Sequence, residues 1–151
     1  TKGTARIMAL DDPTKKMAKS AANPNNYIAL LDSPDEIRRK IKIAVTDSGT
    51  EIINDEKKKP AVANLMRIYR AFSDMSFAQL EKRYAGKGYA DFKHDLAELL
   101  IEKLAPIQKQ YHTLSKDESG IRAILKSGAK IANTVASQTL NRAKGKVGLL
   151  D

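Results

Sequence analysis

Apolar residues recur at helical spacing over most of the chain after residue 33. The pair Ser33-Pro34 is typical of a helix start, and the helix that follows should run to about Val45 with its apolar positions on one face. Residues 62–72 repeat the i, i+3, i+4, i+7 stripe of an amphipathic helix. The core side chains expected from these two helices are Ile37, Ile41, Ala44, Val62, Leu65, Met66, Tyr69 and Phe72.

The pattern predicts three further helices. Ser76 is placed to cap a short one, and the longest begins near Tyr89 and should be kinked at Pro106. Ser115 is placed to cap a final helix, with the acidic residue Asp117 in its first turn. The inward positions expected here are Phe92, Leu96, Leu99, Leu100, Ile107 and Tyr111 in the long helix, and Ile121, Ile124, Leu125, Ile131, Val135, Leu140 and Val147 in the final helix.

The amino-terminal part departs from this helical pattern. Residues 6–10 form a short β-capable run that leads into a loop, and the turn-rich sequence 23–26 follows. A single strand has no partner, so this run should be disordered, domain-swapped or stacked on the helices. The predicted fold is therefore all-α, a helical bundle over residues 34–151 that is preceded by a strand and loop segment over residues 1–33.

The loop of the amino-terminal segment carries the most specific chemistry. Lys15, Lys16 and Lys19 lie within five positions, after Pro13 and among small residues. Ammonium groups this close repel one another unless an anion lies between them, and a mobile ammonium suits a phosphoryl oxygen that gains charge during a reaction. A solvated basic turn is the alternative, and it is the commoner explanation for an isolated lysine cluster.

Composition adds a preference for polyanions. The chain has 27 Lys and Arg against 18 Asp and Glu, a net charge of +9, which favours a partner such as RNA. The absence of cysteine excludes disulfides, thiolate zinc sites and cysteine nucleophiles, and we expect no resident metal site. No stretch approaches 18 apolar residues, so the sequence predicts a soluble, cytoplasmic protein without a membrane segment.

Basic side chains on the helices are candidate RNA contacts. Residues 119–150 contain six basic residues and no acidic one. Three of them follow an i, i+4 ridge, for which a solvated helix face is an equally good interpretation. The candidates are Arg122, Lys126 and Lys130 on this ridge, with Arg67, Arg70 and Lys93 on the earlier helices.

The sequence resembles a known family. The run Ala5-Arg6-Ile7-Met8-Ala9-Leu10, the loop from Asp12 to Ser20 and the turn Asn23-Pro24-Asn25 are similar to the KMSKS segment of the bacterial tryptophanyl-tRNA synthetases. The similarity continues in order through residues 27–32, 41–48, 64–69, 86–93, 95–98, 106–112, 128–133 and 135–137, so it covers essentially the whole chain. Two positions depart from the family's loop, because Ala18 replaces a serine and Ala21 replaces an aspartate.

The resemblance implies ATP-dependent activation of L-tryptophan, release of pyrophosphate and transfer of the amino acid to tRNA(Trp). Lys16 and Lys19 would be the catalytic residues and would bind pyrophosphate oxygens. The ATP-binding residues would also include Ile7 near adenine and the loop positions Met17, Ala18 and Ser20. Mg²⁺ would share the phosphate charge.

The resemblance also sets expectations about the parent enzyme. Residues 1–33 would be the tail of a Rossmann-like catalytic domain, and residues 34–151 would bind the anticodon. The chain has only two histidines, His94 and His112, and no HIGH-type motif. We therefore expect a carboxy-terminal part that is inactive alone, from a parent that forms a homodimer.

Two other classes of protein remain possible on the residues alone. A non-enzymatic helical RNA-binding module would account for the charge and the helices, but it leaves the lysine loop unexplained. A basic amphipathic protein at a membrane surface would also have cationic helices. It is disfavoured because the final helix contains no Trp, Phe or Tyr.

Overall fold

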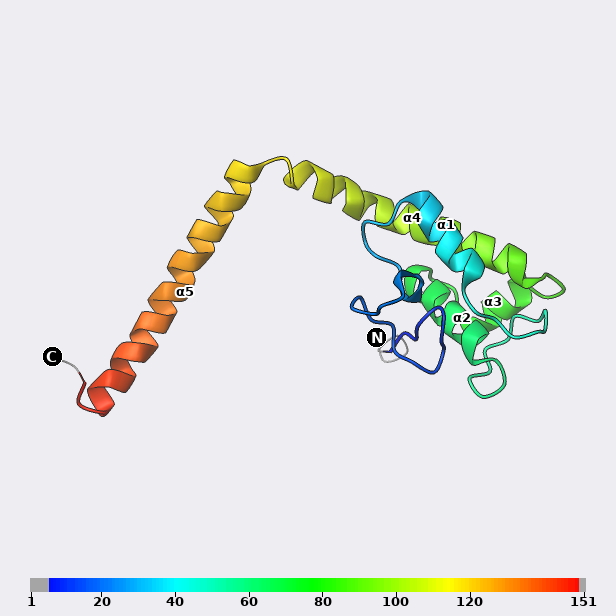
Figure 1. Cartoon of the computed structure of the whole chain (residues 1–151), viewed down its shortest axis with the longest axis horizontal. Coiled ribbons are helices and arrows are strands. Elements are labelled where there is room, and N and C mark those ends of the chain that lie inside the picture. Colours follow the sequence, from blue (N-terminus) through cyan, green and yellow to red (C-terminus); the bar gives the residue numbers. More distant parts are fainter. Residues whose placement is uncertain (1–5, 150–151) are drawn as a thin grey trace. The chain divides into compact units, whose positions relative to one another are not determined.

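The computed structural model describes residues 6–149 of the chain. It falls into two compact units, one ending at Gln108 and the other beginning at Lys109. The regular elements are the 3-10 helix η2 (Pro24–Asn26) and the α-helices α1 (Pro34–Ile43), α2 (Pro60–Phe72), α3 (Phe77–Arg83), α4 (Tyr89–Leu114) and α5 (Glu118–Lys146) (Figure 1). Within the described residues the only β-type pairing is an isolated bridge, so the predicted all-α class is confirmed. The domain boundary expected after residue 33 stays a prediction.

Helix α1 begins as the sequence predicts and ends earlier. The Ser33 hydroxyl accepts a hydrogen bond from the Glu36 N–H at 3.2 Å, which satisfies one of the free donors of the first turn. The helix stops two residues before the expected end because the chain turns to extended geometry at Ala44. The next N–H, of Val45, donates to the Leu10 carbonyl at 2.8 Å and so joins α1 to the amino-terminal segment.

The stripe predicted for α2 is confirmed as the centre of the core. Val62, Leu65, Met66 and Tyr69 are buried, and Phe72 is partly buried against them. The predicted cap of α3 is also confirmed. Ser76 forms a capping box, in which its hydroxyl accepts the Gln79 N–H and the Gln79 side chain accepts the Ser76 N–H.

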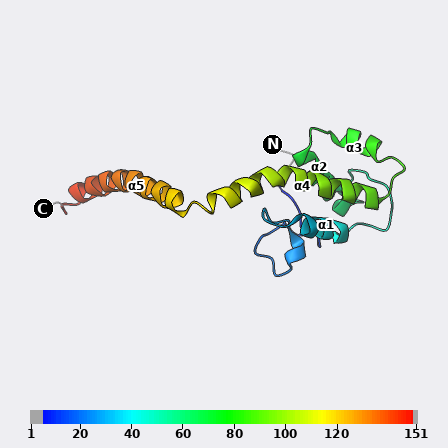
Figure 2. The same ribbon diagram turned by 90° about the horizontal axis from the view of Figure 1, so that it is seen from above.

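The first half of α4 completes the core of the first unit, and Figure 2 shows it running between α1 on one side and α3 on the other. Phe92 stacks on Tyr69 with ring centroids 5.9 Å apart and meets Tyr84 edge-on at 5.1 Å. The helix continues through Pro106. The prediction that Ile107 and Tyr111 point inward is wrong, because their side chains are about half exposed.

The second unit corrects two expectations about the final helix. Its cap is Asp117 rather than Ser115, because an Asp117 carboxylate oxygen accepts the Gly120 N–H at 2.9 Å. The apolar positions expected to point inward are all exposed, from 38% at Ile121 to 70% at Ile124, since no other described element of this unit packs on α5. No helix in residues 6–149 is long and apolar enough to cross a membrane.

Candidate functional site

The loop lysines follow a small hairpin-like turn, and Lys15 and Lys16 lie on its returning side. The Ala9 N–H donates to the Lys15 carbonyl at 2.8 Å, the Met17 N–H donates to the Ile7 carbonyl at 3.0 Å, and Met8 and Lys16 form an antiparallel bridge. The β-capable run thus pairs with the returning side of its own loop. Of the three outcomes expected for this run, the described residues stack on the helices, and Ala9 is 2% exposed.

A buried amide of α2 holds the other edge of this run. Asn64 is 2% exposed, and its side chain accepts the Met8 N–H and donates to the Met8 carbonyl, both at 2.8 Å. The amide therefore satisfies both backbone groups of Met8, as a neighbouring strand would. Sequence reasoning missed Asn64. The available signal was a polar residue within the apolar run of α2.

The three loop lysines have different surroundings. Lys15 is paired with Asp12 at 3.0 Å. Hydrogen bonds from the Thr14 hydroxyl first, and then from Lys15, lower the pKa of Asp12 to about 2. Lys16 and Lys19 are exposed, and within the part of the chain that the structure describes neither has an ion-pair partner. The structure therefore separates the two predicted catalytic lysines from the third.

The remaining predicted ATP-binding positions fall into two groups. Ile7 and Met17 are partly buried against the core and anchor the base of the loop. The side chains of Ala18 and Ser20 are exposed at its tip. The Ala18 N–H donates to the Asn26 side-chain oxygen at 3.1 Å, and the Met17 N–H is bonded to Ile7, so these two amides already have partners inside the protein.

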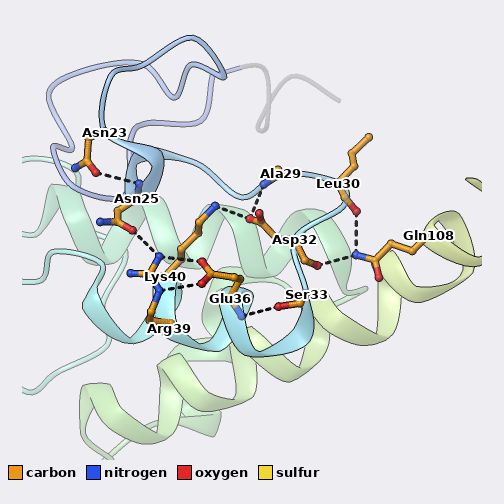
Figure 3. Close-up of polar contacts among 10 residues, drawn as sticks. All are labelled: Asn23, Asn25, Ala29, Leu30, Asp32, Ser33, Glu36, Arg39, Lys40 and Gln108. Atoms are coloured by element: carbon orange, nitrogen blue, oxygen red, sulfur yellow. Dashed lines mark hydrogen bonds and ion pairs between the residues drawn. The ribbon is translucent and has the colours of Figure 1, made fainter. Parts of the chain in front are cut away.

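The segment between the loop and α1 is fixed by buried polar contacts (Figure 3). Lys40 of α1 and Asp32 form an ion pair at 2.6 Å, with only 5% and 15% of their side chains exposed. Gln108 of α4 donates to the Leu30 carbonyl at 2.9 Å and to the Asp32 carbonyl at 3.0 Å. These contacts attach the segment between the loop and α1 to both α1 and α4.

The RNA-contact candidates of the first unit are all engaged within the protein. Arg67 is paired with Glu56, and the Arg70 guanidinium lies 4.8 Å from the centre of the Phe77 ring. The Lys93 ammonium donates to the Ala44 carbonyl at 2.7 Å, and burial lowers its pKa.

Lys93 also lines a pocket that sequence reasoning did not anticipate. The pocket lies between α1 and α4 and has a volume of about 340 Å³. Arg38, Lys42 and His94 contribute further basic groups to its wall. Their spacing along two different helices gave no signal in the sequence, because the grouping depends on how α1 packs on α4.

The basic ridge of the second unit is only partly free. Arg122 is paired with Glu118 at 2.5 Å, one turn earlier on α5. Lys126 and Lys130 are exposed and have no ion-pair partner among residues 6–149. Their positive charge is therefore available to a polyanion.

The loop is chemically suited to phosphate. Its exposed side-chain donors include the Lys16 and Lys19 ammonium groups and the Ser20 hydroxyl, which match phosphoryl oxygens. The ammonium groups carry no acceptor and cannot ligate a metal cation. Among the residues that the structure describes, no cluster of three or more His, Cys, Asp or Glu side chains could hold a metal ion.

Known proteins share this sequence and architecture. The chain is 49% identical over 146 residues to the tryptophan–tRNA ligase of Caldanaerobacter subterraneus and 50% identical over 145 residues to that of Listeria monocytogenes. These matches cover 97% and 96% of the chain but only 44% of each relative, so the chain spans less than half the length of the relatives it matches.

Solved structures of similar proteins give the same result as the sequence matches. The tryptophanyl-tRNA synthetase of Mycoplasma pneumoniae matches 99% of the chain and 45% of its own with a TM-score of 0.82 at 33% identity. That of Campylobacter jejuni, complexed with ADP and tryptophan, matches 96% of the chain and 44% of its own with a TM-score of 0.74 at 30% identity. A family described as tRNA synthetases class I (W and Y) matches residues 2–105, well over half of the sequence. The chain therefore belongs to the class I tRNA synthetases of the tryptophan and tyrosine family.

Proposed function

We propose that this chain is the KMSKS-loop and anticodon-binding part of a tryptophan–tRNA ligase. The observation that carries the proposal is the pair Lys16 and Lys19, two exposed ammonium groups without ion-pair partners in residues 6–149, on a loop whose base is pinned to the helical core. The names of the relatives and the C. jejuni complex with ADP and tryptophan support the choice of substrates.

In this proposal, this part of the enzyme contributes positive charge and the correct placement of that charge. In the activation step the tryptophan carboxylate attacks the α-phosphorus of ATP, and the bond to the pyrophosphate oxygen breaks. Negative charge then builds on the departing pyrophosphate, and Lys16 and Lys19 neutralise it while the Ser20 hydroxyl donates a hydrogen bond. Mg²⁺ that arrives with the nucleotide would share that charge. The aminoacyl group then moves from the adenylate to the terminal ribose of the tRNA, and AMP leaves.

The loop has a buried base and exposed side chains, and this arrangement suits the binding of pyrophosphate. Its base is held by Asn64, by the packing of Ile7 and Met17 and by the contacts behind it, whereas its tip is exposed. Exposed side chains on a backbone that is held in place let the ammonium groups adjust to the moving phosphate without losing their register.

The helices supply the tRNA surface in this proposal. The charges proposed to meet the RNA are Lys126 and Lys130 of α5 and Lys42 in the wall of the pocket between α1 and α4, which are exposed and have no ion-pair partner in residues 6–149. Phosphate contacts of this kind position an RNA without reading its sequence. We also propose that the complete protein, of which this chain is a part, lies in the cytoplasm and forms a homodimer.

Amino-acid-dependent exchange between ATP and labelled pyrophosphate tests the proposal. The complete protein should catalyse exchange when tryptophan is supplied and should not do so with tyrosine, the other amino acid of the family. Exchange driven by tyrosine would overturn the choice of substrate. RNA binding without exchange for either amino acid would favour the alternative, a non-enzymatic helical RNA-binding module.

A further inference from the structure

Asn26, which sequence reasoning assigned only to a turn, forms hydrogen bonds with three residues on the two sides of the lysine loop. Its carbonyl accepts the Leu10 N–H at 3.0 Å. Its side-chain oxygen accepts the Ala18 N–H at 3.1 Å, and its side-chain NH₂ donates to an Asp11 carboxylate oxygen at 2.8 Å. The residue is 7% exposed, so these bonds are largely shielded from water.

The two partners of the Asn26 side chain determine which way its amide group points. The Ala18 N–H can only donate, so it requires the side-chain oxygen of Asn26. The Asp11 carboxylate can only accept, so it requires the side-chain NH₂. The other Asp11 oxygen accepts the Asn23 NH₂ at 2.5 Å. Asp11 thus orients Asn26, and Asn26 determines where the Ala18 peptide lies.

Ala18 occupies the centre of the loop, two residues after Lys16 and directly before Lys19. The Ala18 N–H is bonded to Asn26 and Lys19 follows directly, whereas Lys16 is held separately by its bridge to Met8. A shift of the Ala18 peptide would therefore move Lys19. A misplacement of about 1 Å can cost on the order of 100-fold in rate.

We propose that Asn26, oriented by Asp11, is a positioning residue that sets the location of Lys19 during the reaction. The proposal rests on the proposed function, since it assumes that Lys19 acts on pyrophosphate. Asn26 touches no substrate and works only through the Ala18 peptide.

Swapping the carboxylate of Asp11 and the amide of Asn26 tests this role in the complete protein. In Asn26→Asp two carboxylates face each other, so one hydrogen bond is replaced by repulsion. In the double variant Asp11→Asn with Asn26→Asp, the new amide at position 11 donates to the new carboxylate and still accepts from Asn23. The Ala18 N–H keeps an acceptor, and the net charge returns to that of the wild type.

We expect the single variant to lower the kcat of tryptophan-dependent pyrophosphate exchange by about 5-fold to about 150-fold, with the KM for tryptophan unchanged. The double variant should recover to within about 3-fold of the wild type. The single variant should also recover as the pH falls, because one proton shared between the facing carboxyl groups removes the repulsion.

Asn25→Asp is the matched control. It makes the same chemical change one residue earlier, where the side chain meets the Arg39 guanidinium at 2.8 Å, and it should leave exchange unchanged. Hydrogen exchange of the Ala18 amide provides a readout that does not depend on activity. Protection should be lost in Asn26→Asp and regained in the double variant, which also keeps the test valid if the single variant folds poorly.

The results that would contradict the positioning role differ from those that would contradict the proposed function. Lost Ala18 protection with full exchange activity would overturn the positioning role alone. A double variant that regains neither protection nor activity would overturn the hydrogen-bond arrangement between positions 11, 18 and 26. An inactive wild type would overturn the proposed function, and this role with it.

Discussion

Lys15 and Lys19 carry the same charge four residues apart, but the structure gives them different neighbours. Lys15 is held by Asp12, whereas Lys19 is exposed without an ion-pair partner in the described residues. A salt bridge on an exposed loop contributes little stability, roughly 0–1 kcal/mol. Its effect here is to hold one ammonium at the turn, which leaves Lys16 and Lys19 as the groups available to an anion.

The Asp12 carboxyl gives a test of this turn by pH. Its pKa is lowered to about 2 from an ordinary value of 3.8, first by the Thr14 hydroxyl and then by Lys15. Because the folded pKa is depressed, the turn is favoured above about pH 4 and loses this support as the pH falls through about 2. An NMR titration should show Thr14→Val raising the Asp12 pKa, with Thr14→Ser as the control that retains the hydroxyl. An unchanged midpoint in Thr14→Val would contradict the assigned cause.

At the scale of elements, a single amide joins α2 to the loop. Asn64 satisfies both backbone groups of Met8 in a shielded position. Replacing it by Ala would leave a buried donor and a buried acceptor unpaired, at about 1–3 kcal/mol each. We therefore expect Asn64→Ala to lower the free energy of unfolding by about 2–5 kcal/mol in urea denaturation. Asn25→Ala, which removes one exposed contact, should lower it by under about 1 kcal/mol, and equal losses would contradict this account.

If the basic ridge on α5 contacts RNA, its charges should contribute to the salt dependence of tRNA binding. Changing Arg122, Lys126 and Lys130 together to Gln should flatten the plot of log binding constant against log salt for tRNA by up to about 2–3 units, since each displaced counterion contributes about 0.7–0.9. The control changes Arg142, Lys144 and Lys146 to Gln on the same helix. An unchanged slope in the first triple variant would place the RNA surface elsewhere, around Arg67, Arg70 and Lys93.

The sequence was informative where burial sets the pattern. The stripe of α2 and the cap at Ser76 were predictable because local spacing and capping chemistry determine them. The apolar stripe of α5 was not predictive, because spacing identifies a face that prefers burial but not whether a neighbour covers it. Asn26 and Asn64 could not be assigned either, since their partners lie 8 and 56 residues away.

At the scale of the whole molecule, the loop and the helices form a continuous hydrogen-bonded support within the first unit. Lys93 of α4 holds the end of α1 at Ala44, the next residue, Val45, donates to Leu10, and Leu10 donates to Asn26. The loop tip is therefore attached to the same helices that carry the candidate RNA surface of this unit. The chain matches only 44% of the length of its relatives. Under the proposed function we expect residues 1–151 alone to be inactive in exchange, because they carry no HIGH-type motif.

The most direct test compares Lys19→Ala with Lys15→Ala in the complete protein, because both variants remove one positive charge from the same loop. Tryptophan-dependent pyrophosphate exchange should fall about 30-fold to about 1000-fold in Lys19→Ala, the loss expected for one charge-assisted contact of roughly 2–4 kcal/mol in the transition state. Tryptophan binding should change little. Lys15→Ala should retain activity to within about 3-fold. Wild-type turnover in Lys19→Ala at saturating ATP, or equal losses in both variants, would contradict the account and leave the loop as a solvated basic turn.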